Sequence, residues 1–402
     1  MLSRLHFLTA LACALVVGPT EIRAEKNYGP GVTDTEIKIG QTFPYSGPLS
    51  SYATQARAEA AIFAKLNAEG GVNGRRITFI SLDDGYNPAK TVEQTRKLVE
   101  QDDVLLLFNP LGTPTNLAIV NYVNQRRIPH LFLSASAAVF GDYRTYPWTM
   151  GLAPTYHSET RAFAQYIMKT QPGAKVGVLY QNDNAGRDFL KGVHDGFGAL
   201  ASTYIVKEIS YDVADPTVDS QVISLQAAGA DVFLNLATPK AAAQAIRKAG
   251  SLSWRPTTFV SFVSASVETV MKPAGAENAV GVISSAWFKD PSDPVVKGDP
   301  ALQDYFEFMK RYYPQGDPVA GGNVFAQIAA GALIQVLKQC GDDLSRENVM
   351  RQAESLHGLT HPLLVPGITI DTSPTNHYPI RKLQLQRFDG QKWVRFGELL
   401  GE

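Results

Sequence analysis

The chain has 402 residues, of which 45% are hydrophobic and 19% are charged, and its formal net charge at pH 7 is −1. This composition is typical of a globular protein and excludes a disordered or fibrous chain. It also excludes the basic surplus that would attract nucleic acid or an anionic membrane surface. The length exceeds that of one typical core, so we expect two domains of about 100 to 200 residues each.

Residues 1–24 have the pattern of a secretory signal peptide. Arg4 supplies a positive start, an apolar stretch runs from Phe7 to Val17, and cleavage is expected near Ala24. The stretch is too short to span a bilayer, and no later segment holds about 18 consecutive apolar residues. We therefore expect a periplasmic protein without a transmembrane helix. Cys13 lies inside the leader and leaves a lipid-anchored form as an alternative.

Removal of this leader leaves Cys340 as the only thiol of the mature chain. A single cysteine cannot form an intramolecular disulfide, although the periplasm is oxidising. The stability of the folded protein must therefore come from its core.

Strand-like and helix-like segments alternate from residue 36 to about residue 262. The strand-like runs are IKIGQ, ITFISL, VLLLFN, HLFL, KVGVLY, YIVKEI, DVFLNL and TTFVSFV. Helical spacing lies between them, for example at Ala56, Ala60 and Phe63, and Gly70 and Gly71 end that helix. Apolar strands joined by helices indicate parallel sheets that are covered on both faces. The predicted fold class is α/β and doubly wound.

The alternation breaks at residues 142–154 and again after residue 287, where a Pro- and Asp-rich segment begins. Three helices are then expected without an intervening strand, at Leu302–Tyr312, Gly322–Gln339 and Ser345–Leu356. Residues 366–398 are predicted to form a β-hairpin with a turn at Asp389-Gly390. We expect the chain to pass between two lobes at these breaks, so that the connections together form a hinge.

Two of the strand-like runs continue directly into polar turns. VLLLFN is followed by Pro110, Leu111, Gly112, Thr113 and Pro114, and HLFL is followed by Ser134, Ala135, Ser136 and Ala137. The carboxyl ends of neighbouring parallel strands lie at one edge of a sheet, so two helix N-termini would direct unpaired N–H groups at one cleft. This arrangement predicts a site for a carboxylate.

The opening segment, EIKIGQTFPYSGPLSSYATQARAEAAIFAKLNAEGGVNGRRITFISLDDGYNPAK, resembles the start of periplasmic Leu/Ile/Val-binding-type proteins of ABC importers. The resemblance rests on the turn at residues 46–48, the helix that ends at residues 69–74, and Asp83-Asp84 before Pro88, and it continues more loosely to residue 400. It implies a type I periplasmic binding protein with two lobes, joined by three crossovers, that close on a ligand. Expected lobes are residues 26–148 plus 284–360 and residues 149–283 plus 361–402.

The resemblance also implies the ligand contacts. The two turns correspond to family positions that hold a ligand carboxylate, and an aromatic residue after the Ser-Gly-Pro turn walls the pocket. The matching residues are Tyr52, Gly112, Thr113, Ser134, Ser136 and Ala137. Each residue also has a structural interpretation, because Thr113-Pro114 and the two serines could cap helices and Tyr52 could pack in the core.

The second lobe departs from the amino-acid-binding pattern. Ala185 stands where the family usually has a tyrosine, and Ser261–Ser264 lacks the acidic residue that pairs an α-ammonium, although Glu268 lies nearby. An unpaired buried ammonium is costly. We therefore expect an aromatic or other hydrophobic acid without an α-amine, as in the aromatic-acid-binding branch, with Ala185 and Phe262 in the pocket wall. Trp148 and Trp287 are either wall or core residues.

The predicted partners are a small-molecule carboxylate and the membrane permease of an ABC importer, and the protein is expected to be a monomer without cofactor or metal. The sequence has no G-x-S-x-G, H-E-x-x-H, Walker A or G-x-G-x-x-G motif, so we do not expect an enzyme. An amino-acid binding protein, a ligand-sensing module for a membrane receptor and an exported α/β enzyme remain alternatives.

Overall fold

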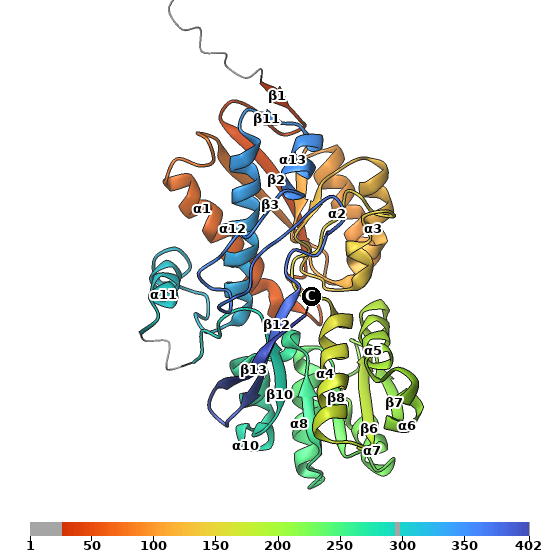
Figure 1. Ribbon diagram of the computed structural model, residues 1–402. Coiled ribbons are helices and arrows are strands. Elements are labelled where there is room, and N and C mark those ends of the chain that lie inside the picture. Colours follow the sequence, from red (N-terminus) through yellow and green to blue (C-terminus); the bar gives the residue numbers. More distant parts are fainter. Residues whose placement is uncertain (1–25, 294–297, 402) are drawn as a thin grey trace, which may run out of the picture.

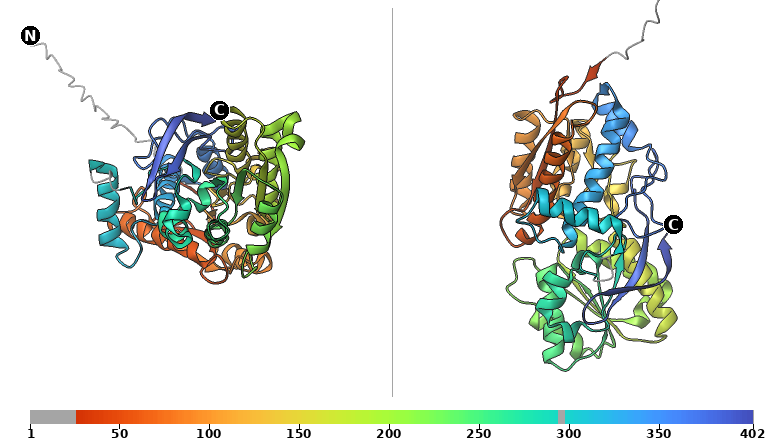
Figure 2. Two further views of the ribbon diagram at one scale, coloured as in Figure 1. Left: turned by 90° about the horizontal axis from the view of Figure 1, so that it is seen from below. Right: turned by 90° about the vertical axis from the view of Figure 1, so that its left-hand side faces the viewer.

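The computed structural model describes residues 26–293 and 298–401. The predicted signal peptide and Cys13 lie outside the described residues. Two lobes are stacked end to end, each built on its own sheet (Figure 1). The side view in Figure 2 shows helices on both faces of the sheets and the end marked C near the level where the lobes meet. Among the described residues, no helix has both the length and the apolar character needed to cross a bilayer.

The first lobe contains a four-stranded parallel sheet with the order β3-β2-β4-β5. Its strands are β2 (Glu36–Phe43), β3 (Arg76–Asp83), β4 (Leu106–Phe108) and β5 (His130–Leu131). Its helices are α1 (Ala53–Ala68), α2 (Pro88–Glu100), α3 (Thr113–Gln125), α11 (Pro300–Tyr312), α12 (Gly321–Cys340) and α13 (Arg346–Ala353). The predicted strands and the three consecutive late helices are thus confirmed.

The second lobe contains a seven-stranded sheet with the order β13-β12-β10-β9-β8-β6-β7. Its strands are β6 (Val176–Gln181), β7 (Ile205–Tyr211), β8 (Val232–Leu236), β9 (Thr257–Val260), β10 (Ile283–Ala286), β12 (Lys382–Phe388) and β13 (Trp393–Gly401). Its helices are α4 (Tyr156–Thr170), α5 (Asn184–Phe197), α6 (Ala201–Tyr204), α7 (Asp219–Ala227), α8 (Pro239–Ser251), α9 (Lys272–Ala274) and α10 (Ala276–Ala279). The hairpin predicted over residues 366–398 is present as β12–β13, but it begins only at Lys382 and extends to Gly401. Strand β12 runs antiparallel to β10.

The chain passes between the sheets after β5, after β10 and after α13, which agrees with the doubly wound, two-lobed type I fold. Leu363, Ile370 and Ile380 pack into the core cluster that includes Leu302 and Leu333 of the first lobe. The exact lobe boundaries expected from the sequence stay a prediction.

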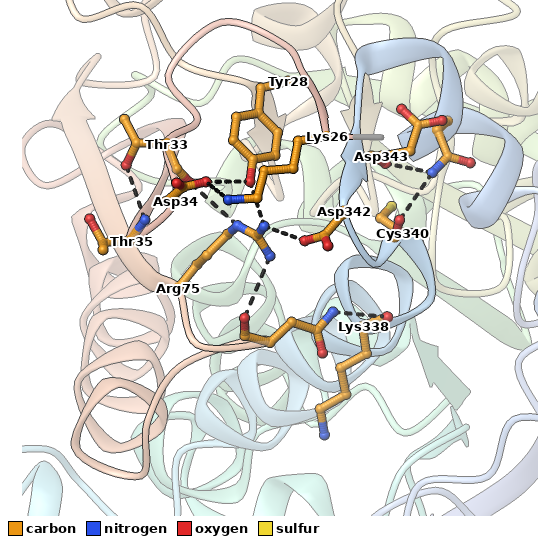
Figure 3. Close-up of polar contacts among 12 residues, drawn as sticks. Lys26, Tyr28, Thr33, Asp34, Thr35, Arg75, Lys338, Cys340, Asp342 and Asp343 are labelled. Carbon is orange, nitrogen blue, oxygen red and sulfur yellow. Dashed lines mark hydrogen bonds and ion pairs between the residues drawn. The ribbon is translucent and has the colours of Figure 1, made fainter. Parts of the chain in front are cut away.

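The polar contacts of Figure 3 join the first described strand to the segment around Asp342 and Asp343 of the first lobe. Strand β1 (Asn27–Tyr28) pairs in parallel with β11 (Asp343–Leu344). The guanidinium of Arg75, whose side chain is only 4% exposed, donates to the Asp342 carboxylate at 2.5 Å and to the Tyr28 hydroxyl at 2.7 Å. A buried guanidinium is tolerated only when its N–H groups are paired, so this cluster fixes three chain segments to one another.

Substitution Arg75→Met is expected to lower the free energy of unfolding by about 2 to 3 kcal/mol, because it removes the paired charge from beside Asp342 and Tyr28. Urea denaturation measures the change. Lys65→Met, which breaks an exposed pair with Glu69, is the control and should change stability by less than about 0.5 kcal/mol. Equal effects of the two substitutions would contradict a stabilising role for the Arg75 cluster.

Candidate functional site

A cavity of about 200 Å³ lies between the lobes. The first lobe contributes Leu49, Tyr52, Gln55, Tyr86, Leu111, Gly112, Thr113, Ser134 and Ser136 among others. The second lobe contributes Gln181, Ala185, Phe189, Leu236, Thr238, Phe262, Val263, Ser266 and Trp393. Strand β10 adds Ser285, the connection after β10 adds Trp287, Phe288 and Asp290, and α12 adds Gly321 and Phe325. Aromatic and aliphatic side chains form most of this wall.

The structure brings most of the sequence-predicted residues to this one cavity. Tyr52, Gly112, Thr113, Ser134, Ser136, Ala185 and Phe262 line it. Ala137 lies outside the lining, and its carbonyl accepts a hydrogen bond from the Tyr378 hydroxyl at 2.9 Å. Trp287 lines the cavity, whereas Trp148 packs against the core of the first lobe. That these residues contact a ligand stays a prediction.

The turn after β4 opens helix α3 beside the cavity. Gly112 has φ 101°, and a Cβ atom there would lie 2.4 Å from the Tyr86 ring, so only glycine fits this position. The Thr113 hydroxyl is buried and has no hydrogen-bond partner among the described residues. The Tyr156 phenol lies close to it: burial raises the pKa of Tyr156, and the nearby Ser136 backbone and Thr113 hydroxyl oppose that rise. The turn therefore places a buried hydroxyl beside the Tyr156 phenol, and both groups line the cavity.

The turn after β5 does not begin an α-helix, and the prediction of two adjoining helix N-termini is wrong. The backbone at Ser134 and Ser136 stays extended because the Ser134 carbonyl accepts the Gly112 N–H at 3.1 Å and the Ser136 carbonyl accepts the Tyr156 N–H at 2.9 Å. Only a four-residue 3₁₀ helix, η2 (Ala138–Gly141), follows. The Gly112 N–H is thus occupied, and α3 is the single helix that begins at these turns.

A buried polar network supports the first-lobe wall. The Gln55 amide donates to the Asn109 side chain at 2.6 Å, to the Ser134 hydroxyl at 3.1 Å and to the Glu59 carboxylate at 3.4 Å. Glu59 also accepts from Gln41 at 2.5 Å, and burial raises its pKa to about 8. These bonds fix the orientation of Ser134 and Gln55 at the cavity.

Glu159 of α4 forms the hydrogen bonds that support the second-lobe wall of the cavity. Its carboxylate accepts the Ser261 hydroxyl at 2.5 Å, the Phe262 backbone N–H at 2.8 Å and the Ser285 hydroxyl at 2.6 Å. Burial raises the pKa of Glu159 to about 7 against the effect of these three donors. One side chain therefore holds the ends of β9 and β10 together at the cavity wall.

Two aromatic hydroxyls reach across the cleft. The Tyr52 hydroxyl donates to the Val263 carbonyl at 3.2 Å, and the Gln181 amide donates to the Tyr86 hydroxyl at 3.4 Å. Both contacts join a first-lobe residue to a second-lobe residue, so the structure represents the lobes in contact across the cavity.

One carboxylate among the described residues lines the cavity at a distance in sequence from Ser261–Ser264, and whether any acid pairs a ligand ammonium stays a prediction. The carboxylate is that of Asp290, in the connection after β10. Glu268 does not line the cavity and instead pairs with Lys272 at 2.5 Å. In the sequence, an acid was considered only near Ser261–Ser264. Asp290 was not identified because the Pro- and Asp-rich segment that contains it has the composition of a linker.

Three other residues that line the cavity were also not predicted from the sequence. Gln55 lies one turn after Tyr52 in α1, Tyr86 follows the acidic pair at the end of β3, and Tyr156 is the first residue of α4. All three follow the rule that strand ends and helix starts of parallel sheets face the ligand cleft. The Gly321-Gly322 pair at the start of α12 was a further signal, since it removes side chains from the cavity rim.

The chain belongs to the periplasmic binding protein family, whose model matches residues 36–392. It is 23% identical over 321 residues to a Leu/Ile/Val-binding protein homolog 7 of Brucella suis, covering 77% of this chain and 79% of that protein. It resembles the structure of a fatty acid ABC transporter substrate-binding protein from Thermomonospora curvata, with a TM-score of 0.80, 22% identity and coverage of 94% and 95% of the two chains.

A branched chain amino acid ABC transporter structure from Thermus thermophilus with bound valine is similar as well, with a TM-score of 0.83, 16% identity and coverage of 92% and 98%. These two structural similarities establish the fold. The binding of valine and the transport of fatty acid are properties of those proteins.

The buried acids predict a pH dependence of stability. Because Glu59 and Glu159 have raised pKa values of about 8 and about 7, the folded state binds their protons more tightly than the unfolded state, and stability should fall as pH rises from about 4.5 to 8. His130, whose pKa burial lowers to about 3, has the opposite effect below pH 6.5. The carboxyl effect is therefore isolated between pH 6.5 and 8.

In that range the wild-type protein is expected to lose about 1 to 2 kcal/mol of unfolding free energy, and Glu59→Gln should make the profile flatter. Urea denaturation at several pH values measures the slope. Glu69→Gln, which removes an exposed carboxylate, should leave the slope unchanged. A wild-type stability that rises from pH 6.5 to 8 would refute the assignment.

Proposed function

We propose that this protein is the substrate-binding protein of an ABC importer and that its two lobes close on an aromatic or other hydrophobic acid without an α-amine. The observation that carries the proposal is the cavity between the lobes, which combines neutral polar groups, among them the unpartnered Thr113 hydroxyl, at one wall with a largely apolar remainder. The periplasmic delivery of such a ligand to a membrane permease is part of the same proposal.

The carboxylate is expected at the start of α3. The helix supplies the positive end of its dipole, the Thr113 hydroxyl has no partner among the described residues, and the Ser136 side chain lines the same wall. No Lys, Arg or His side chain lines the cavity within the described part of the chain. Neutral donors at a helix start are sufficient to bind a carboxylate, and the contribution of each grows once closure removes water.

The apolar body of the ligand is expected to contact the aromatic wall. Phe189, Phe262, Trp287, Phe288 and Phe325 line the cavity from three different parts of the chain. Burial of apolar surface stabilises the complex by about 25 cal/mol per Å². Together with the carboxylate contacts, this supports a dissociation constant of about 1 μM. The transport of fatty acid by a structurally similar protein agrees with such a ligand.

A branched-chain or other amino acid is the second candidate, because the curated relatives are named Leu/Ile/Val-binding proteins. Its α-ammonium would lie within one carbon of the carboxylate and hence beside Thr113. Asp183, an acid that acts on the neighbouring Tyr156, already accepts the Gly186 N–H at 3.0 Å and a bond from Gln181. The ammonium would therefore lack a free partner.

Matched ligands that differ only in the α-amine test this choice. We expect hydrocinnamate and isocaproate to raise the melting temperature of the mature protein and to bind at micromolar concentrations, whereas L-phenylalanine and L-leucine do neither. Thermal shift followed by calorimetry measures both. Ser136→Phe, which fills the cavity, should abolish the response of the acids without loss of the folded state. The reverse preference would reject the amine-free ligand in favour of an amino acid.

The unpartnered Thr113 hydroxyl gives a sharper test. Thr113→Val keeps the shape but removes the donor, so affinity for octanoate should fall about tenfold while stability stays equal or increases. Thr95→Val is the matched control, because Thr95 in α2 also has a buried hydroxyl without a partner among the described residues but does not line the cavity. Unchanged octanoate affinity in Thr113→Val would exclude this residue from the carboxylate site.

A further inference from the structure

Asp290 is the only carboxylate among the described residues that line the cavity. It accepts two hydrogen bonds from Ser292, from the backbone N–H at 2.9 Å and from the hydroxyl at 2.8 Å, and no described cation forms an ion pair with it. The neighbouring Lys289 is paired with Asp299 at 2.5 Å. Burial, together with the nearby acids Asp293 and Glu268, raises the pKa of Asp290. The carboxyl group therefore faces the cavity without a counterion.

Trp287 provides a second polar group without a partner on the same segment. Its side chain is fully buried and lines the cavity, and its Nε1–H has no acceptor among the described residues. The rings of Phe262, Phe288 and Phe325 surround it in edge-to-face contacts with centroid distances of 6.3, 4.7 and 5.2 Å. An apolar environment of this kind offers no acceptor, and an unsatisfied buried N–H is unfavourable.

These two groups lie on different elements from the carboxylate site. Asp290 and Trp287 belong to the connection after β10, and the Trp287 ring packs edge-to-face on Phe325 of α12. Thr113 instead begins α3, beside the Tyr156 phenol. A ligand whose carboxylate lies at Thr113 would therefore meet Asp290 and Trp287 with another part of the molecule.

We propose that Asp290 and Trp287 form a subsite for a hydroxyl group that the ligand carries remote from its carboxylate. A hydroxyl donates one hydrogen bond to Asp290 and accepts one from the Trp287 indole, so that one small group satisfies both. An ammonium can donate to Asp290 but has no lone pair for Trp287, and a terminal methyl satisfies neither. The inference rests on the proposed function and narrows its substrate class to apolar acids with a distal hydroxyl.

The experiment compares the calorimetric affinities of octanoate, ω-hydroxyoctanoate and ω-aminooctanoate, and those of hydrocinnamate and para-hydroxyhydrocinnamate. In the wild-type protein at least one of the two hydroxylated acids should bind about tenfold more tightly than its unsubstituted counterpart, and the ω-amino acid should gain less. For each pair, the ratio of the two affinities is compared between the wild-type protein and a variant. A general effect of the substitution on packing changes both affinities and therefore cancels in this ratio.

Three variants locate the effect. Asp290→Asn preserves an oxygen that can accept the Ser292 N–H, and Trp287→Phe preserves an aromatic ring, so both should fold. Each should reduce the hydroxyl advantage at least threefold while the unsubstituted acids still bind. Glu268→Gln removes a nearby acid that does not line the cavity and should leave the ratio unchanged.

Equal binding of hydroxylated and unsubstituted acids would overturn the hydroxyl subsite and leave the proposed function intact. A larger gain for the ω-amino acid would overturn it in favour of an ammonium site at Asp290. If no acid binds to the wild-type protein, both the proposed function and the subsite are rejected.

Discussion

No Lys, Arg or His side chain lines the cavity between the lobes in the described part of the chain, so the carboxylate that we propose there would be bound by neutral donors alone. A buried cation would need a counterion whenever the site is empty. Neutral donors such as the Thr113 hydroxyl and the start of α3 can instead be solvated when the lobes separate. The proposed site therefore uses strand ends and a helix start rather than long basic side chains, and no buried cation of the protein would lose its partner when a ligand leaves.

The arrangement of the two sheets supports such a site. Parallel strands end at one edge, so each lobe directs its carboxyl-terminal turns at the other lobe. Buried acids then hold these turns in place: Glu59 works through Gln55 in the first lobe, and Glu159 binds Ser261, Phe262 and Ser285 in the second. Because each acid bonds only within its own lobe, the walls can move as units while the connections bend.

The sequence predicted the elements better than the site. Apolar runs such as VFLNL and helix-start signals such as Asn87-Pro88 depend only on neighbouring residues. The strand and the helix that they predict are therefore found where expected. The turn at Ser134–Ala137 was mistaken for a helix start because its extended form depends on bonds to Gly112 and Tyr156, which are remote in sequence. Asp290 was missed for a related reason, since only the folded chain brings the connection after β10 and the start of α12 to one cavity.

The hairpin β12–β13 determines when, during synthesis of the chain, the sheet of the second lobe can be completed. Strand β12 pairs with β10, so residues 382–401 complete a sheet whose other strands begin at residue 176. The second lobe therefore cannot finish its sheet until residues 382–401 have left the ribosome. For a chain that is predicted to cross a membrane before folding, this late closure keeps the nascent lobe incomplete and so favours passage in an unfolded, translocation-competent state.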